Sequence, residues 1–283
     1  MENYDDTVWA NTPCKTFRYC ELVANDKKPI HNGWQRNTKS FDEVWAAYEA
    51  KKSNIGLVLG DTSNVMDIDC DSREAVALMD RVADGYLGHF KRTEDSAHYL
   101  FRCLGGGKTV RLNGPEGDCV IELRGDGGQT MVPPSTHPEG QKLSMKDWDN
   151  DASQYDYDHL YRLVHRVGAL ALVMRGWQVG SRHQLSIAFS GLCQSLGITS
   201  EDTHTMVQLV CDATNDEETK ARLINSTRTY DRSSASNIGF SGVSELLGKA
   251  CAERISQWLC KGYGIQPARR QLAVSSIDPI SLE

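Results

Sequence analysis

The sequence lacks any apolar run long enough to cross a membrane, because the longest, Val167 to Met174, is far shorter than the roughly 20 residues of a transmembrane helix. The N-terminus shows no basic, apolar and small-residue series of the kind found in secretion signals. Low-complexity tracts are also missing, and the composition is 40% hydrophobic and 24% charged. We therefore expect a globular protein of the cytoplasm with no membrane partner.

The nine cysteines include no CxxC pair, and their odd number does not suit a disulfide framework. Reduced thiols are expected, as in cytosolic proteins. Cys14, Cys20 and His31 are too loosely spaced to form a zinc site, so the sequence predicts no zinc.

Positive charge is in short supply, because 31 lysines and arginines stand against 38 aspartates and glutamates, which gives a net charge of -7. An acidic chain attracts nucleic acid only weakly unless a local basic groove compensates. Non-specific contact with DNA should therefore be weak and sensitive to salt. The length of 283 residues favours two domains of ordinary size.

The first half of the chain predicts short strands, glycine-rich turns and two helices. Ser40 and Glu43 form a capping box before a helix over 41–51, and residues 71–74 begin a second helix that buries Val76 and Met79. Apolar runs between turn residues predict strands over 54–59, 65–70, 98–103, 119–124 and 129–132. This order predicts an α+β sheet covered by helices.

From about residue 150 the hydrophobic pattern takes a helical period. The acidic stretch 147–151 predicts a linker. Leu185 to Leu196 carry one apolar face that ends at Gly197, and Ser200 is expected to cap the next helix. Asn215, followed by acidic residues, is expected to begin another helix. The second half is therefore predicted to be all-α.

Two carboxylates, Asp67 and Asp69, share one face of the predicted strand over 65–70, because side chains alternate along a strand. Adjacent carboxylates need a cation, and hard oxygen ligands suit Mg²⁺ or Mn²⁺. Glu122 and Arg124 share a strand face in the same way, and His98 opens another strand. Each pattern taken alone is also typical of ordinary strand ends at the surface.

The most unusual stretch runs from Gly125 to Gly140. Its glycines allow backbone amides to approach a phosphate closely, and the prolines at 133 and 134 stiffen a loop that offers Ser135 and His137. A tight hairpin with a rigid exit explains the same residues without any ligand.

These motifs together resemble the bifunctional primase-polymerase branch of the archaeo-eukaryotic primase superfamily. The resemblance rests on the DxD at Asp67, the SxH at Ser96, and a carboxylate ahead of the RGxGG and PPSxHxxG segments, and it covers about 27 to 143. The third carboxylate is commonly Asp in that family, whereas here it is Glu122. The second half resembles the helical primase C-terminal domain, through the segments 180–183, 215–218, 229–232 and 242–248.

The resemblance implies an RRM-like palm with an added α/β portion over 1–150, an all-α helical bundle over 151–266, and a tail or linker over 267–283. It implies template-directed nucleotidyl transfer on single-stranded DNA, with synthesis and extension of primers from NTPs and dNTPs. Two Mg²⁺ or Mn²⁺ ions would be held by Asp67, Asp69 and Glu122. Nucleotide contacts would come from His98, Ser96, Arg124, Ser135 and His137, and template contacts from Arg182, His183, Arg228 and Arg232.

A replication protein of a phage, plasmid or integrated element, acting in a bacterial host and joined to a helicase domain or subunit, is the expected setting. Two other functions remain open. Carboxylates and a histidine on adjacent strands also serve metal-dependent nucleases. A non-catalytic DNA-binding initiator would keep the motif residues only as structure, although no tyrosine beside a His-x-His pair supports a rolling-circle nickase.

Overall fold

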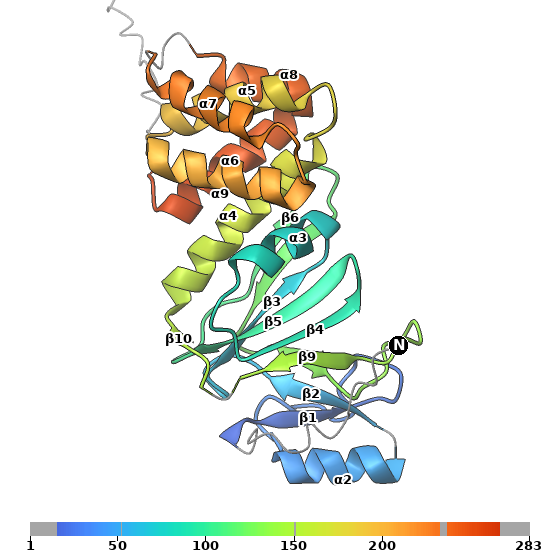
Figure 1. Cartoon of the computed structure of the whole chain (residues 1–283). Helices are drawn as coiled ribbons and strands as arrows, with labels where there is room; N and C mark the ends of the chain where they lie inside the picture. Colours follow the sequence, from blue (N-terminus) through green and yellow to red (C-terminus); the bar gives the residue numbers. More distant parts are fainter. Residues whose placement is uncertain (1–15, 52, 150, 233–236, 267–283) are drawn as a thin grey trace, which may run out of the picture.

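The structure is a computed structural model that describes residues 16–51, 53–149, 151–232 and 237–266. An α+β region with antiparallel sheets is followed by an all-helical region, so the expected fold class is confirmed (Figure 1). The predicted tail over 267–283 lies outside the described residues. No described helix is both long and apolar enough to traverse a bilayer.

The elements of the two regions follow one another with short connections. The α+β region contains β1 (Tyr19–Leu22), α2 (Phe41–Lys51), β2 (Asn54–Val58), β3 (Val65–Cys70), α3 (Arg73–Val82), β4 (Gly88–Thr93), β5 (Ser96–Cys103), β6 (Val110–Asn113), β7 (Cys119–Arg124), β8 (Gln129–Val132), β9 (Ser144–Trp148) and β10 (Gln154–Tyr155). The helical region contains α4 (Tyr157–Arg175), α5 (Arg182–Ser195), α6 (Ser200–Thr214), α7 (Thr219–Tyr230), α8 (Gly239–Leu247) and α9 (Lys249–Tyr263).

The strands form a small sheet and a large one. The small sheet has the order β1-β2-β8, and α2 packs against it. The large sheet has the order β6-β7-β3-β5-β4-β9 with antiparallel neighbours, and β10 adds to β5 in parallel. Since β3 lies between β5 and β7, each of its side chains has cross-strand neighbours on both sides.

The local signals of the first half are confirmed. Ser40 and Glu43 make the expected capping box, in which the Ser40 amide donates to Glu43 Oε2 at 2.8 Å. The helix then runs over Phe41–Lys51 as predicted. β3, β7 and β8 occupy their predicted bounds, with Met66 and Ile68 buried in the core.

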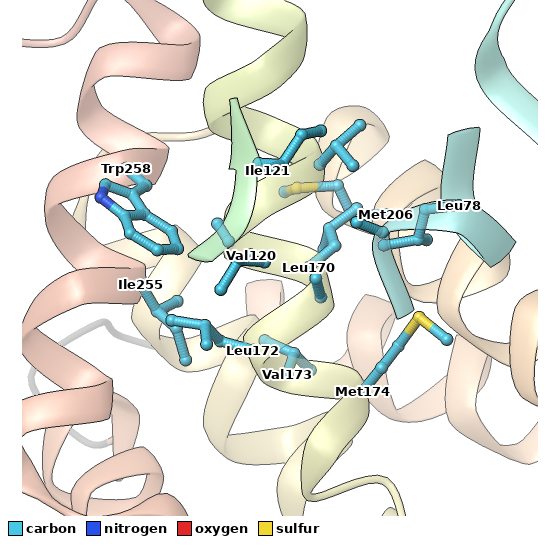
Figure 2. Packing of buried hydrophobic residues seen from close by; sticks show 14 of the residues in the cluster. Leu78, Val120, Ile121, Leu170, Leu172, Val173, Met174, Met206, Ile255 and Trp258 are labelled. Atoms are coloured by element: carbon cyan, nitrogen blue, oxygen red, sulfur yellow. The ribbon is translucent and has the colours of Figure 1, made fainter. Parts of the chain in front are cut away.

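One buried core joins the large sheet to the helical region. The face of the sheet that carries Met66, Ile68 and Ile121 packs against α3 and α4, and the same cluster continues into α5, α6 and α9. Figure 2 shows Val120 and Ile121 of β7 beside Leu170 of α4 and Trp258 of α9. The opposite face of the sheet is therefore left for the small sheet and for polar side chains.

A glycine in the middle of α4 permits the close approach of this helix. A Cβ added at Gly168 would lie 2.8 Å from Leu112 Cδ1 and 3.2 Å from the Trp258 ring. Both distances are shorter than ordinary van der Waals contact. α4 is thus seated closely against both β6 and α9.

The linker predicted over 147–151 is wrong at its first residues, which end β9. Asp147 pairs with His89, and Trp148 pairs with Gly88, along β4. The Trp148 ring covers Gly88 so closely that a Cβ there would lie 2.7 Å from it. Since β9 is an edge strand with one side open to solvent, it tolerates the charged residues that suggested a linker.

The predicted helix starts in the helical region also need correction. Thr199 rather than Ser200 is the N-cap of α6, and its Oγ1 accepts from the Asp202 amide at 3.0 Å. Asn215 ends α6 in a left-handed conformation with φ of 50°, which asparagine tolerates better than most residues. α7 begins only at Thr219, and the carboxylate of Asp216 turns inward.

Candidate active site

Strand register brings the candidate catalytic residues together on the open face of the large sheet. In β3, Asp69 lies opposite His98 of β5 on one side and Glu122 of β7 on the other. Asp67, two residues earlier, lies opposite Arg124. Side chains that occupy the same face of adjacent strands at one level are neighbours. The three carboxylates therefore form one cluster with His98 and Arg124.

The distances within this cluster show how its charges are shared. His98 Nδ1 lies 3.0 Å from Asp67 Oδ2, and His98 Nε2 lies 3.6 Å from Asp69 Oδ1. Arg124 Nη1 lies 3.7 Å from Asp67 and 3.6 Å from Asp69, and its Nε lies 3.9 Å from Glu122 Oε2. Arg124 is fixed by a hydrogen bond that its Nη2 donates to the Gln129 carbonyl at 2.6 Å.

Burial and neighbouring charge set the protonation of the cluster. Burial raises the pKa of Asp69 to about 6, and the adjacent carboxylate of Asp67 adds to this rise. Burial acts on Asp67 as well, but the charges of His98 and Arg124 outweigh it and hold the pKa of Asp67 below its ordinary value. Although burial disfavours the imidazolium, Asp69 and Asp67 raise the pKa of His98.

The donor set fits a divalent cation. Within the described residues no group of three His, Cys, Asp or Glu side chains is arranged as a ready metal site, and His98 and Arg124 supply the positive charge beside the aspartates. Asp69 Oδ1 is nevertheless buried and accepts no hydrogen bond from any described residue. A buried carboxylate oxygen without a partner is costly, and hard oxygen donors suit Mg²⁺ or Mn²⁺.

A small cavity of about 60 Å³ opens beside the cluster, between the two sheets. Residues from both sheets and from the loop after β8 line it, with carboxylates and cations on the same wall. The lining residues are Lys27, Asp69, Asp71, Arg92, Ser96, His98, Arg124, Gln129, Thr130, Met131, His137 and Leu143.

The loop after β8 separates the residues predicted to touch a nucleotide. His137 lines the cavity together with Ser96, His98 and Arg124. Ser135 does not line it and is fully buried. The Ser135 hydroxyl accepts from the Ile55 amide at 2.8 Å, so it fastens the loop to β2.

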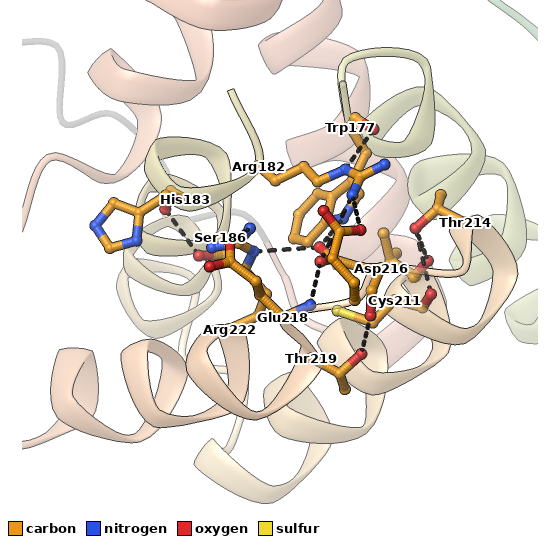
Figure 3. Close-up of polar contacts among 12 residues, drawn as sticks. Trp177, Arg182, His183, Ser186, Cys211, Thr214, Asp216, Glu218, Thr219 and Arg222 are labelled. Atoms are coloured by element: carbon orange, nitrogen blue, oxygen red, sulfur yellow. Dashed lines mark hydrogen bonds and ion pairs between the residues drawn. The ribbon is translucent and has the colours of Figure 1, made fainter. Parts of the chain in front are cut away.

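The four residues predicted to touch a template lie in the helical region, away from this cavity. Arg182 is engaged with acidic groups, since its Nη1 lies 2.7 Å from Glu217 Oε2 and 3.7 Å from Asp216 Oδ1 (Figure 3). His183 Nδ1 lies 3.2 Å from Asn225 Nδ2. Arg228, on α7, and Arg232, just after it, are exposed.

Sequence reasoning missed the residues that β4 contributes to the site. The Phe90 ring is buried and stacks on the His98 imidazole, with centroids 4.6 Å apart and an interplanar angle of 16°. Arg92, further along the same strand, lines the cavity. Alternating positions of one strand share a face, so this pair could have been found once β4 itself was recognised.

Phe90 should act by holding His98 in position. Phe90→Leu keeps an apolar side chain of similar volume, so the loss of stability should stay below about 1.5 kcal/mol. Loss of the stacked ring should lower the kcat of single-nucleotide incorporation by about 10-fold, because small errors of placement are expensive at a reacting centre. Phe101→Leu is the matched control, since Phe101 lies on the opposite face of β5. Equal losses in both variants would rule out the positioning role.

Comparison with known protein families gives one match. The model of the bifunctional DNA primase/polymerase N-terminal domain matches residues 3–154, which is more than half of the 283 residues. The chain belongs to the bifunctional DNA primase/polymerase family. No curated protein matches the chain.

Membership in this family makes the protein a nucleotidyltransferase whose substrates are nucleotides and a DNA template. The matched residues contain both sheets and therefore the whole carboxylate cluster. α4 to α9 follow the matched region, so the family match leaves them unassigned. Primase/polymerases of this family are typically metal-dependent, in agreement with the oxygen donors of the cluster.

Proposed function

We propose that the chain copies single-stranded DNA, synthesising primers and extending them from NTPs or dNTPs by a two-metal mechanism. The observation that carries this proposal is the row formed by His98, Asp69 and Glu122 on three adjacent strands, in which Asp69 Oδ1 has no described hydrogen-bond partner. A catalytic row on a rigid sheet keeps its geometry when substrates exchange.

Asp67, Asp69 and Glu122 would hold the divalent ions. Bound there, the ions would supply Lewis-acid activation of the attacking 3'-hydroxyl and charge neutralisation on the triphosphate. Asp67 is fully buried and fixed by His98, whereas Asp69 and Glu122 are slightly exposed to the cavity side. We assign Asp67 as the most rigid of the three carboxylates.

His98 and Arg124 would bind the phosphates of the incoming nucleotide. Asp67 holds His98 through Nδ1, whereas Nε2 is beyond hydrogen-bond distance of Asp69 and is free to donate to a phosphate oxygen. The carboxylates raise the pKa of His98 and so favour the cationic ring that an anionic ligand prefers. Ser96 and His137 complete the nucleotide side of the cavity, and Ser135 supports the loop that carries His137.

We further propose that residues 1–150 are the catalytic domain and that residues 151–266 are a helical primase C-terminal domain that contacts the template. The exposed Arg228 and Arg232 suit contact with phosphates. Arg182 is tied to Glu217 and Asp216, so it would orient the start of α5 beside His183.

The direct test uses single-stranded template, labelled nucleotides and Mg²⁺ or Mn²⁺, with and without an annealed primer. We expect labelled products in both reactions, and none when the divalent ion is chelated. Extension only from a primer would restrict the function to that of a polymerase. Cleavage of the template without nucleotide incorporation would favour a nuclease, and no reaction would favour a non-catalytic binding module.

A further inference from the structure

A second group of polar side chains gathers in the cavity, away from the three carboxylates. Arg92 comes from β4, Lys27 from the loop after β1, and His137 from the loop after β8. Arg92 Nη1 lies 2.9 Å from His137 Nε2. Three segments that are far apart in sequence thus place their cationic or donor groups at one point.

The hydrogen bonds of His137 cannot all be satisfied by the protein. The Glu139 amide donates to His137 Nδ1 at 3.2 Å, while Arg92 presents an N–H group to Nε2. A neutral imidazole has only one acceptor nitrogen, so one of these contacts sets a donor against a donor. An acceptor with more than one oxygen would resolve this conflict.

Arg92 carries a further donor without a partner. Its Nε is buried and, among the described residues, none accepts a hydrogen bond from it. Leaving a buried charged donor unpaired is unfavourable, so such an atom in a cavity indicates a missing acceptor. The acidic side chain facing this group is Glu139, whose Oε2 lies 3.7 Å from His137 Nδ1 and which is 62% exposed.

The electrostatics of the group also favour an anion. Burial lowers the pKa of His137, and the positive charges of Lys27 and Arg92 lower it further. The cations thus reinforce one another instead of being neutralised. Phe90 connects this group with the carboxylates, since its ring stacks on His98 two residues before Arg92 on β4.

We infer that Lys27, Arg92 and His137 form a polyphosphate subsite, and that Arg92 selects nucleoside triphosphates over monophosphates by binding the terminal phosphates. The inference rests on the proposed function, because it assumes that His98 and the carboxylates engage the phosphate at which transfer occurs. A planar guanidinium with two free N–H directions is suited to adjacent phosphate oxygens, whereas an ammonium offers only a point charge.

The test measures binding of inorganic tripolyphosphate to the full chain by calorimetry in the presence of EDTA. The wild-type chain should bind tripolyphosphate, and inorganic monophosphate should bind much more weakly. Arg92→Gln should weaken tripolyphosphate binding by about 10-fold or more, and Arg92→Lys should fall between. Lys249→Gln removes an equal charge from the exposed face of α9 and should change nothing.

Lys27→Gln provides a second variant, because Lys27 is an exposed loop residue whose replacement should not disturb folding. It should also weaken tripolyphosphate binding. No binding by the wild-type chain, unchanged binding in Arg92→Gln, or an equal loss in Lys249→Gln would each overturn the subsite. A reduced melting temperature in Arg92→Gln transfers the decision to Lys27→Gln.

These outcomes are separate from those of the proposed function. Binding of tripolyphosphate in EDTA without any nucleotide incorporation would leave the subsite standing and remove the polymerase. Full incorporation with an unchanged KM for dNTP in Arg92→Gln would do the opposite.

Discussion

Asp67→Asn should lower both primer synthesis and primer extension by about 10³-fold or more, on the scale expected when a group that stabilises transition-state charge is removed. Asp67 is fully buried and lies within 3.0 Å of His98 Nδ1 and 3.7 Å of Arg124 Nη1. Asparagine keeps the shape of the side chain but removes the negative charge that would hold a cation. Steady-state nucleotide incorporation measures the loss.

The matched control for this variant is Asp61→Asn, which makes the same chemical change on an exposed turn between β2 and β3. Its activity should stay within about twofold of wild type, because exposed substitutions away from a site have small effects. Alanine at position 67 is less informative, since it would also deprive the buried His98 of its acceptor. Near wild-type synthesis by a folded Asp67→Asn chain would refute the two-metal proposal.

Asp216→Ala should destabilise the protein by about 3–5 kcal/mol, because it leaves a buried charge without its partner. The Asp216 carboxylate is buried and accepts from Trp177 Nε1 at 2.9 Å and from Arg222 Nε at 3.2 Å (Figure 3). The Arg222 side chain is only 5% exposed, so water cannot replace the lost acceptor. Thermal unfolding should shift downward by roughly 10 °C.

Glu217→Gln serves as the control for this network. Glu217 is the neighbouring acid, its side chain is 68% exposed, and it pairs with Arg182. Its replacement should cost less than about 1 kcal/mol, as is usual for surface ion pairs. If Asp216→Ala and Glu217→Gln melt at the same temperature, the buried contacts around Asp216 contribute little to stability.

The carboxylate arrangement was predictable from sequence because β3 is a central, buried strand. Met66 and Ile68 point into the core, which forces Asp67 and Asp69 to the other face. The register with Glu122 and His98 then follows from pairing on both sides. Periodicity alone gives the shared face of each pair, whereas the order of the strands comes only with the structure.

β4 escaped prediction because its charges are neutralised by distant residues. Lys91 pairs with Asp80 of α3 at 2.7 Å, on the face of the sheet opposite to Arg92. Such a partner is invisible in the local pattern, and a strand with charges on both faces resembles a loop. The residues of the polyphosphate subsite were missed with it.

Loop residues were the hardest to assign. Ser135 lies in the most unusual stretch of the chain, but its partner is the backbone of Ile55, 80 residues away. Asp216 likewise suggested an exposed helix start, although Trp177 and Arg222 bury it. In both cases tertiary contacts override the local signal of a polar residue near a turn.

The family match ends at residue 154, just before α4 begins at Tyr157, although α4 covers one face of the sheet inside the matched region. A fragment cut at that boundary would expose Phe101, Ile121 and Leu123 to water. Such an apolar surface drives aggregation. Exchange of this catalytic module between proteins would therefore require that α4, or a helix with an equally small residue at the place of Gly168, travel with it.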